Sequence, residues 1–314
     1  RPRPAPTDAP GAALPLREAL TRRLRKWHKD AVAQGARFEK LDTDARHALR
    51  KRIKRLRYGL SFAENLLPAR RLRAVHGHHI VPPEICGSVL AIGNFDGVHR
   101  GHQALMLAAR EEARKTGKTA GVMVFEPHPR EFFRPDEPHF RLTTLDQKLR
   151  LVERLGMDFA IVMKFDADLA NLPATRFIEK ILVRDLQVSH VVIGYDFFFG
   201  KGRGGNPELM RSAGLEHGFG VTVIPPVAEA GEAFSSSAIR AKLSAGDVRS
   251  AAHDLGHWWR IVGTVTGGAK RGTGLGFPTA NITLPKGTAL AHGIYAVRVY
   301  VDGQRHHGAA YLGT

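Results

Sequence analysis

The chain has 314 residues, 43% of them hydrophobic, which allows two or three domains and argues against wholesale disorder. The single cysteine, Cys86, excludes an internal disulfide framework and a cysteine-based zinc site, and it fits a reducing, cytoplasmic setting. The net charge of +17 favours polyanionic partners, whereas the absence of a long apolar run predicts no membrane partner.

Most of this charge lies near the N-terminus. Residues 1–75 carry 20 Lys and Arg against 7 Asp and Glu, whereas the remaining residues carry 27 against 23. Residues 1–15 are rich in Pro and Ala and predict a disordered leader. Residues 16–67 have a helical pattern with one apolar stripe, formed by Leu49, Ile53, Leu56 and Leu60. We therefore expect a basic α-helical segment at the N-terminus.

From Ser88 short strands alternate with helices. We expect strands over 89–92, 121–125, 159–163, 190–193 and 221–224, and helices over 103–115, 145–155, 174–182 and 207–217. This order predicts an α/β fold with a parallel, doubly wound sheet, which binds ligands at the carboxyl ends of its strands. Further strands are expected over 260–266 and 294–301, at the start of an all-β domain.

The sequence GNFDGVHRGH, residues 93–102, follows the first of these strands and opens a helix. Glycine lets the backbone approach a ligand closely, and a helix N-terminus presents unpaired N–H groups to phosphate. His99 and His102 can both donate hydrogen bonds to phosphate oxygens. The plain alternative is a tight turn with two surface histidines.

Two further segments carry residues suited to nucleotides. GYDFFFGKGRGG, residues 194–205, places three phenylalanines and a basic glycine loop after a strand, as an aromatic wall for a flat ligand or as core and linker. FSSSAIR, residues 234–240, starts a helix with serines and places Arg240 one turn later. One serine is explained as a helix N-cap, but three serines with an arginine also suit phosphates.

Two proline-containing segments are less specific. FEPHP, residues 125–129, is a stiff loop at the ligand edge, and it fits a flat substrate or a structural turn equally well. GTGLGFPTAN, residues 272–281, offers the oxygens of Thr279 and Asn281 to Mg²⁺ held with substrate phosphates, or it is a turn between strands.

From residue 73 to the end, the chain resembles the bacterial bifunctional riboflavin kinase/FMN adenylyltransferases. The resemblance rests on the segments above, in the same order, with FEPHP extended to FEPHPREFF, and on the run RLTTLDQK at residues 141–148. It implies a Rossmann-like nucleotidyltransferase domain followed by a β-barrel flavokinase domain. It also implies the substrates ATP, FMN and riboflavin, with Mg²⁺ as the cofactor.

The resemblance assigns roles within this sequence. His99, His102 and Arg240 are expected to be catalytic, and His128, Pro129 and Phe199 to contact the flavin. Thr279 and Asn281 are expected to hold Mg²⁺ in the kinase domain. The residues expected to bind ATP are Gly93, Asn94, Phe95, Asp96, Gly97, Gly194, Asp196, Phe197, Arg203, Ser235, Ser236 and Ser237.

Three departures from the family pattern stand out. Thr273 replaces an arginine that is usual in the kinase signature, and Asn206 replaces a frequent aspartate. The chain ends before the region in which the family carries its kinase glutamate. An incomplete barrel and loss of riboflavin phosphorylation are therefore expected.

Residues 20–70 resemble the end of a CHAD domain, carried by the run HALRKRIKRLRY. The resemblance implies binding of polyphosphate at residues 16–73, and the local positive charge predicts weak binding of polyphosphate or nucleic acid there. The alternative is a solvated basic helix. We expect domains over 1–72, 73–250 and 256–314. Two alternative functions remain open, an HxGH nucleotidyltransferase with another substrate and a polyanion-binding protein with an enzyme remnant.

Overall fold

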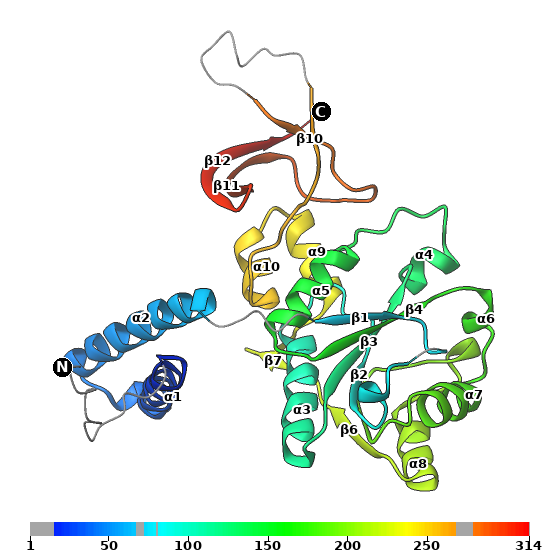
Figure 1. Ribbon diagram of the computed structural model, residues 1–314. Helices are drawn as coiled ribbons and strands as arrows, with labels where there is room; N and C mark the ends of the chain where they lie inside the picture. Colours follow the sequence, from blue (N-terminus) through cyan, green and yellow to red (C-terminus); the bar gives the residue numbers. More distant parts are fainter. Residues whose placement is uncertain (1–15, 67–71, 80, 268–278, 314) are drawn as a thin grey trace, which may run out of the picture. The chain divides into compact units, whose positions relative to one another are not determined.

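The computed structural model describes residues 16–66, 72–79, 81–267 and 279–313, which form parts of two compact units, residues 1–70 and 71–314 (Figure 1). In the first unit, α1 (Leu16–Gly35), η1 (Phe38–Lys40) and α2 (Thr43–Leu66) confirm the predicted basic helices. Leu49 is buried, whereas Ile53 on the same predicted stripe is 50% exposed. The predicted leader over 1–15 lies outside the described residues.

The second unit is built on a six-stranded parallel sheet, which confirms the predicted fold class. Its strand order is β1-β4-β3-β2-β5-β6. Five strands match the predictions closely, whereas the edge strand β1 was not expected. The bounds are β1 (Arg73–His76), β2 (Val89–Ile92), β3 (Ala120–Glu126), β4 (Phe159–Lys164), β5 (His190–Gly194) and β6 (Gly220–Ile224).

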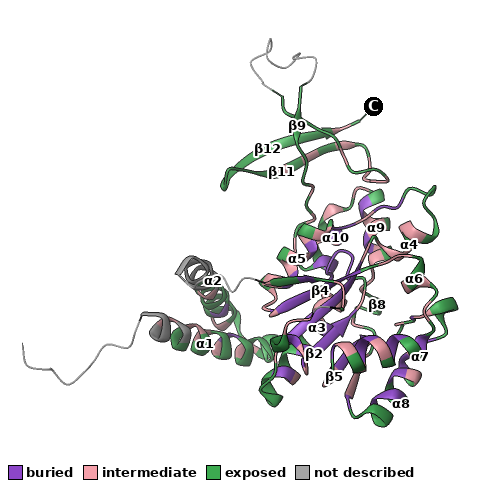
Figure 2. Cartoon of the chain, turned by 45° about the vertical axis from the view of Figure 1, so that its right-hand side comes forward, coloured by how far each residue is buried: buried purple, intermediate pink, exposed green. Residues whose placement is uncertain are grey.

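Helices cover both faces of the sheet because successive strand side chains point to opposite faces. In β2, Val89 and Ala91 pack with α3 (Arg100–Thr116) and α5 (Leu145–Arg154), whereas Leu90 and Ile92 pack on the other face. That other face carries α7 (Ala174–Arg176), η3 (Phe177–Asp185) and α8 (Pro207–His217). The four central strands, β2 to β5, are accordingly mostly buried (Figure 2). The helix predicted over 174–182 is a short α-helical turn that continues as the π-helix η3.

The strand order reverses between β2 and β5, since β2 leads to β3 on one side and β5 lies on the other. Ligands of open parallel sheets bind at such a switch point. Short elements follow the carboxyl ends of the other strands. They are α4 (Pro129–Phe133), α6 (Ala167–Ala170), η4 (Lys201–Arg203), β7 (Ala228–Glu229) and β8 (Glu232–Ala233). The short helix η2 (Pro83–Ile85) instead precedes β2.

A smaller core joins α9 (Ser236–Ser244) and α10 (Val248–Leu255) to Phe140 and Leu142. The domain boundary that we expected at residue 250 falls inside α10. Asn206, one of the departures from the family pattern, is the N-cap of α8 and accepts a hydrogen bond from the Leu209 N–H at 2.9 Å. Asparagine and aspartate both suit this position.

After α10, the described residues form two antiparallel pairs, one of two-residue strands and one of nine-residue strands. They are β9 (Val265–Thr266) with β10 (Asn281–Ile282), and β11 (Gly293–Val301) with β12 (Gln304–Leu312). The strand predicted over 260–266 is wrong except for its last two residues, because residues 260–264 pair with no described strand. The segment 268–278 lies outside the described residues. None of the described helices is long and apolar enough to cross a membrane.

Candidate functional site

The loop after β2 has a strained backbone. Phe95 and Val98 adopt left-handed conformations with φ of 48° and 45°, which are unfavourable for large side chains. Gly97 has φ of 83°, and a Cβ there would lie 2.9 Å from the side chain of Leu142. Such strain persists only where the surroundings fix the backbone, and it is frequent at functional sites.

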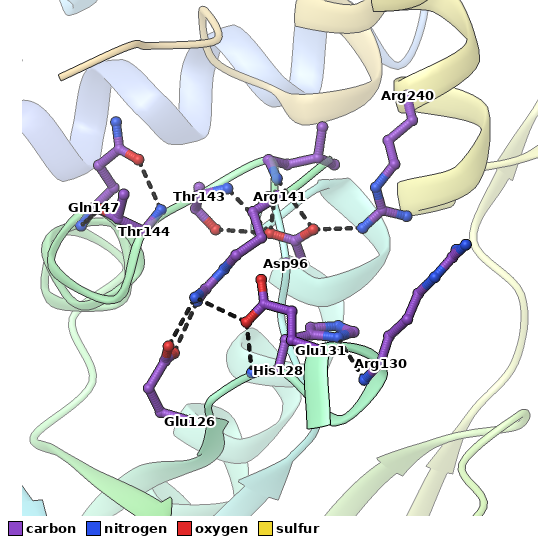
Figure 3. A network of polar contacts seen from close by, with 11 residues as sticks. Asp96, Glu126, His128, Arg130, Glu131, Arg141, Thr143, Thr144, Gln147 and Arg240 are labelled. Carbon is purple, nitrogen blue, oxygen red and sulfur yellow. Dashed lines mark hydrogen bonds and ion pairs between the residues drawn. The ribbon is translucent and has the colours of Figure 1, made fainter. Parts of the chain in front are cut away.

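Asp96 provides that fixation. Its carboxylate is 3% exposed and accepts hydrogen bonds from the Leu142 and Thr143 N–H groups at 3.0 Å and from the Thr143 hydroxyl at 3.2 Å. It also pairs with the Arg240 guanidinium, whose Nε donates to the Phe140 carbonyl at 2.6 Å (Figure 3). One carboxylate therefore joins the β2–α3 loop to the segment before α5 and to α9.

This geometry changes the roles expected for Asp96 and Arg240. Burial alone would raise the pKa of Asp96, but the Arg240 charge and the backbone donors outweigh it and hold the pKa below the usual value. The ionised carboxylate is engaged with protein groups and holds the loop, and the expected contact of Asp96 with ATP stays a prediction. Two nitrogens of the Arg240 guanidinium are likewise engaged, because Nε donates to the Phe140 carbonyl and Nη2 donates to the Asp96 carboxylate.

His99 and His102 lie together at the N-terminus of α3. His99 is the N-cap, and its Nδ1 accepts from the His102 N–H at 3.4 Å. The two rings stack with 3.5 Å between centroids and 23° between planes. A Cβ at Gly101 would lie 3.0 Å from the His99 ring, so glycine at this position leaves room for the stack.

Both imidazoles are neutral near pH 7. Burial lowers the pKa of His99 to about 4, although the Asp96 carboxylate acts in the opposite direction. Burial, followed by the charges of His99 and Lys148, lowers the pKa of His102 well below its usual value. Neutral rings donate hydrogen bonds without carrying permanent charge, and an arriving anion would favour their protonation.

The lowered pKa of His99 predicts a loss of stability in acid. In the unfolded chain His99 takes up a proton near pH 6.5, whereas in the folded protein it does so only near pH 4. Protons therefore bind the unfolded state first as the pH falls, and this residue alone removes on the order of 3 kcal/mol between pH 6.5 and 4. Urea unfolding across this range measures how the free energy of unfolding depends on pH. This dependence should be shallower in His99→Gln than in the wild type, and unchanged in the exposed control His217→Gln. Equal slopes for His99→Gln and the wild type would contradict the assignment.

The FEPHP loop is held to the same region by ion pairs. Arg141 forms a bidentate pair with Glu126, at 2.7 and 2.8 Å (Figure 3). His128 caps α4, since its ring Nδ1 accepts a hydrogen bond from the Arg130 backbone N–H at 3.1 Å. The backbone N–H of His128 in turn donates to the Glu131 carboxylate. Burial lowers the pKa of His128 to about 4. The stiff loop that the sequence predicts is thus fastened to the strand end.

Several buried polar atoms in this region have no hydrogen-bond partner among the described residues. They are His102 Nδ1, His139 Nε2 and Arg141 Nε. His139 lies against His128, with 4.7 Å between ring centroids. Buried polar groups without partners are costly, so they indicate where a polar ligand would supply the missing hydrogen bonds.

The three serines before Arg240 have three different environments. Ser235 is the N-cap of α9 and accepts from the Ala238 N–H at 3.1 Å. Ser236 donates to the Asp96 carbonyl at 2.9 Å, which joins the start of α9 to the loop at the start of α3. Ser237 is exposed in the first turn of α9. Two helix N-termini therefore meet at the end of β2, an arrangement that suits an anion.

The segment after β5 divides between surface and core. Asp196 is exposed, Phe197 is partly buried, and the Arg203 guanidinium lies over the exposed Phe198 ring at 4.7 Å. Phe199, expected at the flavin, is 8% exposed and stacks on Phe197 within the core. The core-and-linker alternative therefore describes Phe199, whereas Asp196 and Arg203 remain accessible to a ligand.

Lys148 is a residue of this region that the sequence analysis did not single out. Its side chain is 1% exposed, and its ammonium group has no hydrogen bond or ion pair with the rest of the described chain. Burial lowers the pKa of Lys148 to about 8, although Asp96 acts to raise it. Its charge acts on His102 and His128 as well. The sequence feature that could have indicated Lys148 is its place in the run RLTTLDQK, one turn after Thr144, the N-cap of α5.

Thr279 and Asn281, the residues expected to hold Mg²⁺ in the kinase domain, take no part in the contacts described above. Asn281 begins β10 opposite Thr266, and both Thr279 and Asn281 are exposed. The predicted glycine loop 272–278, with Thr273, lies outside the described residues. Asp302 and Gly303 form the turn between β11 and β12, with φ of 48° and 77°.

Comparison with protein families gives three matches along the chain. The family described as FAD synthetase matches residues 81–238, and the riboflavin kinase family matches residues 255–314. The CHAD domain family matches residues 2–78. The first match contains the loop after β2, the FEPHP loop, Lys148 and the start of α9.

Curated relatives cover most of this chain. The bifunctional riboflavin kinase/FMN adenylyltransferase of Escherichia coli K12 is 41% identical over 77% of the chain and 77% of its own length. The Bacillus subtilis protein of the same name is 37% identical with the same coverage. A crystal structure described as a macrolide-efflux protein from Streptococcus pneumoniae superposes with a TM-score of 0.68 and 27% identity, covering 77% of this chain and 79% of that one.

Proposed function

The chain belongs to the family of bifunctional riboflavin kinase/FMN adenylyltransferases, and we propose that the residues around Asp96 and His102 carry its adenylyl transfer. The domain transfers AMP from ATP to FMN and releases pyrophosphate. The observation that carries this assignment of residues is the meeting of two helix N-termini at the end of β2, joined by the hydrogen bond from Ser236 to the Asp96 carbonyl.

The reaction needs positioning and charge stabilisation rather than a protein nucleophile. A phosphate oxygen of FMN attacks the α-phosphorus of ATP, and the bond from that phosphorus to the bridging oxygen of pyrophosphate breaks. His99 and His102 donate hydrogen bonds to the transferring and leaving phosphates, and the N-termini of α3 and α9 add their dipoles. Asp96 and Arg240 act by fixing the loop and α9.

The flavin is placed by the stiff FEPHP loop. His128 and Pro129 begin α4, and the ion pair of Glu126 with Arg141 holds this loop against the segment that also clamps Asp96. Support for a ligand at this position comes from the unpartnered Nε2 of His139 beside His128. FMN is thereby brought to the same strand edge as the phosphates of ATP.

Magnesium fits this site as an ion carried by ATP. The Asp96 carboxylate is occupied by Arg240, Leu142 and Thr143, so it is not free to hold a metal. Mg²⁺ prefers oxygen ligands and is often bound mainly through substrate phosphates, where it offsets their charge. In the kinase domain, the side chains of Thr279 and Asn281 carry oxygens of the kind that Mg²⁺ prefers as ligands. We propose that these two residues hold Mg²⁺ there.

A test of acceptor identity separates this function from its alternatives. The purified chain is given MgATP with FMN, with riboflavin or with phosphopantetheine, and the products are resolved chromatographically. We expect FAD from FMN and no adenylylated phosphopantetheine, since the aromatic and histidine residues of the FEPHP region suit a flavin. FMN formed from riboflavin would indicate kinase activity of residues 255–314, and it would not affect the adenylyl assignment.

The N-terminal unit supports a second, separate binding role. In α2, a run of basic side chains between positions 50 and 55 is exposed, and the CHAD family matches this region. We infer that residues 16–73 bind a polyanion such as polyphosphate or nucleic acid through charge.

Binding of polyphosphate should therefore weaken steeply as salt is raised, because counterion release drives such association. The measurement is the slope of log affinity against log salt for the full chain and for a chain lacking residues 1–72. The shorter chain should lose binding and keep FAD synthesis. Binding that does not respond to salt, or that survives the deletion, would contradict the inference.

A further inference from the structure

Two histidines and an aspartate lie together away from the adenylyl site. His78 and His79 follow the edge strand β1, and Asp185 is the last residue of η3. One ligand atom from each residue lies within 4.8 Å of the other two. His78 Nδ1 is 2.6 Å from Asp185 Oδ2, and the two histidine rings are 3.9 Å apart between centroids.

The tertiary fold creates this cluster, since 107 residues separate His78 from Asp185 along the chain. None of the segments assigned to ATP, FMN or the kinase domain contains any of the three residues. Nothing in the local sequence places Asp185 beside the end of β1, so the cluster is visible only in the folded chain.

We propose that His78, His79 and Asp185 form a binding site for one divalent transition-metal ion, for which Zn²⁺ is the natural probe. Two imidazole nitrogens and one carboxylate oxygen are ligands that Zn²⁺, Co²⁺ or Ni²⁺ accept, whereas Mg²⁺ and Ca²⁺ prefer oxygen alone. Three protein ligands leave a further position for water, as in open zinc sites.

The carboxylate is already oriented for this role. Asp185 Oδ1 accepts a hydrogen bond from Arg184 Nε at 2.7 Å, which leaves Oδ2 facing His78. Partners of this kind around a metal site fix the orientation of its ligands. The side chains of His78 and Asp185 are 11% and 14% exposed, so their positions are constrained by packing, whereas the exposed His79 can turn toward the ion.

Metal binding requires a small rearrangement. Two ligands of a tetrahedral ion are about 3.3 Å apart, given bonds of about 2.0 Å, so the His78–Asp185 pair must open slightly. In the metal-free protein Nδ1 donates its proton in a hydrogen bond to Asp185 Oδ2, and an ion between these two atoms displaces that proton. The neutral His78 ring then carries its single N–H on Nε2, and the released proton goes to solvent. Lys180 lies near enough to His78 for its positive charge to act on the ring, and that charge opposes the cation.

Binding would tie the end of the edge strand β1 to the end of η3. An ion that binds only the folded state stabilises it by mass action, so the thermal midpoint should rise with zinc concentration. This consequence does not depend on the adenylyl transfer reaction.

The test titrates the full, chelator-treated chain with Zn²⁺ in competition with a chromophoric chelator. We expect one equivalent of tight binding in the wild type and at least a tenfold loss of affinity in His79→Ala and in Asp185→Asn. His76→Ala is the matched control, because His76 is an exposed histidine of the same short segment that is not in the cluster. Lys180→Gln should strengthen binding several-fold by removing the opposing charge.

Equal affinities for the wild type and His79→Ala would overturn the proposal. So would an equal loss in His76→Ala, because it would indicate general binding by surface histidines. Since Asp185→Asn could weaken the fold, His79→Ala is the deciding variant, with folding checked by circular dichroism and FAD synthesis expected unchanged. Substitution with Co²⁺ should give tetrahedral visible absorption in the wild type and none in His79→Ala.

Discussion

Replacing His102 by alanine should slow FAD formation by about 10²–10³-fold, as expected when one group that stabilises developing phosphate charge is removed. His102 lies in the first turn of α3, stacked on His99, and its buried Nδ1 has no partner among the described residues. In the proposed site this atom meets a phosphate, whereas the FEPHP loop is proposed to hold the flavin.

The measurement is therefore kcat and the FMN dissociation constant, determined separately. We expect kcat to fall while FMN binding stays close to that of the wild type. His217→Ala, at an exposed position near the end of α8, is the matched control and should leave both quantities unchanged. A His102→Ala enzyme with normal turnover would contradict the proposed role and leave His102 as a packing residue of the turn.

Replacing Asp96 by alanine should destabilise the nucleotidyltransferase domain by about 3–5 kcal/mol, the usual cost of removing one member of a buried ion pair. The substitution leaves the Arg240 guanidinium without its carboxylate, and it leaves the Leu142 and Thr143 N–H groups without an acceptor. The strained loop at Phe95 and Val98 also loses the contacts that hold it.

Denaturant unfolding of Asp96→Ala and of the exposed control Asp136→Ala measures this effect. The control should change the free energy of unfolding by less than about 0.5 kcal/mol, as is usual for surface substitutions. If Asp96→Ala does not fold, Arg240→Leu and the double variant Asp96→Leu/Arg240→Leu test the same pair. The double variant should be more stable than Asp96→Ala. Equal stability of Asp96→Ala and the control would contradict a clamping role.

The parallel sheet could be predicted because its strands are short apolar runs separated by helical patterns. Burial on both faces makes such runs visible in the sequence, as in 89–92, where alternate side chains enter opposite cores. The edge strand β1 escaped prediction because only Val75 among its four residues is buried. The strand expected over 260–266 is wrong for most of its length, because residues with β-preference form a strand only beside a partner strand. The partner strand β10 pairs only with Val265 and Thr266.

The location of the candidate site could be predicted from glycine-rich segments that follow strands, but the contacts of each side chain could not. Asp96 looks like a ligand residue in GNFDG, yet its partners are the backbone 46 residues later and Arg240, 144 residues later. Lys148 lies in the first turn of α5, and Arg141 lies in the loop before this helix. Neither segment has a phosphate-binding pattern. Their proximity to the site depends on how α5 packs, which the local sequence does not encode.

The most direct test of the central claim follows the α-phosphorus of ATP. The purified chain is incubated with Mg²⁺, FMN and ATP labelled at the α-phosphorus, in parallel with ATP labelled at the γ-phosphorus. We expect α-label in FAD and γ-label in pyrophosphate, with the two products formed in equal amounts. A folded chain that produces no α-labelled FAD, or that releases γ-label as inorganic phosphate instead, would contradict this claim.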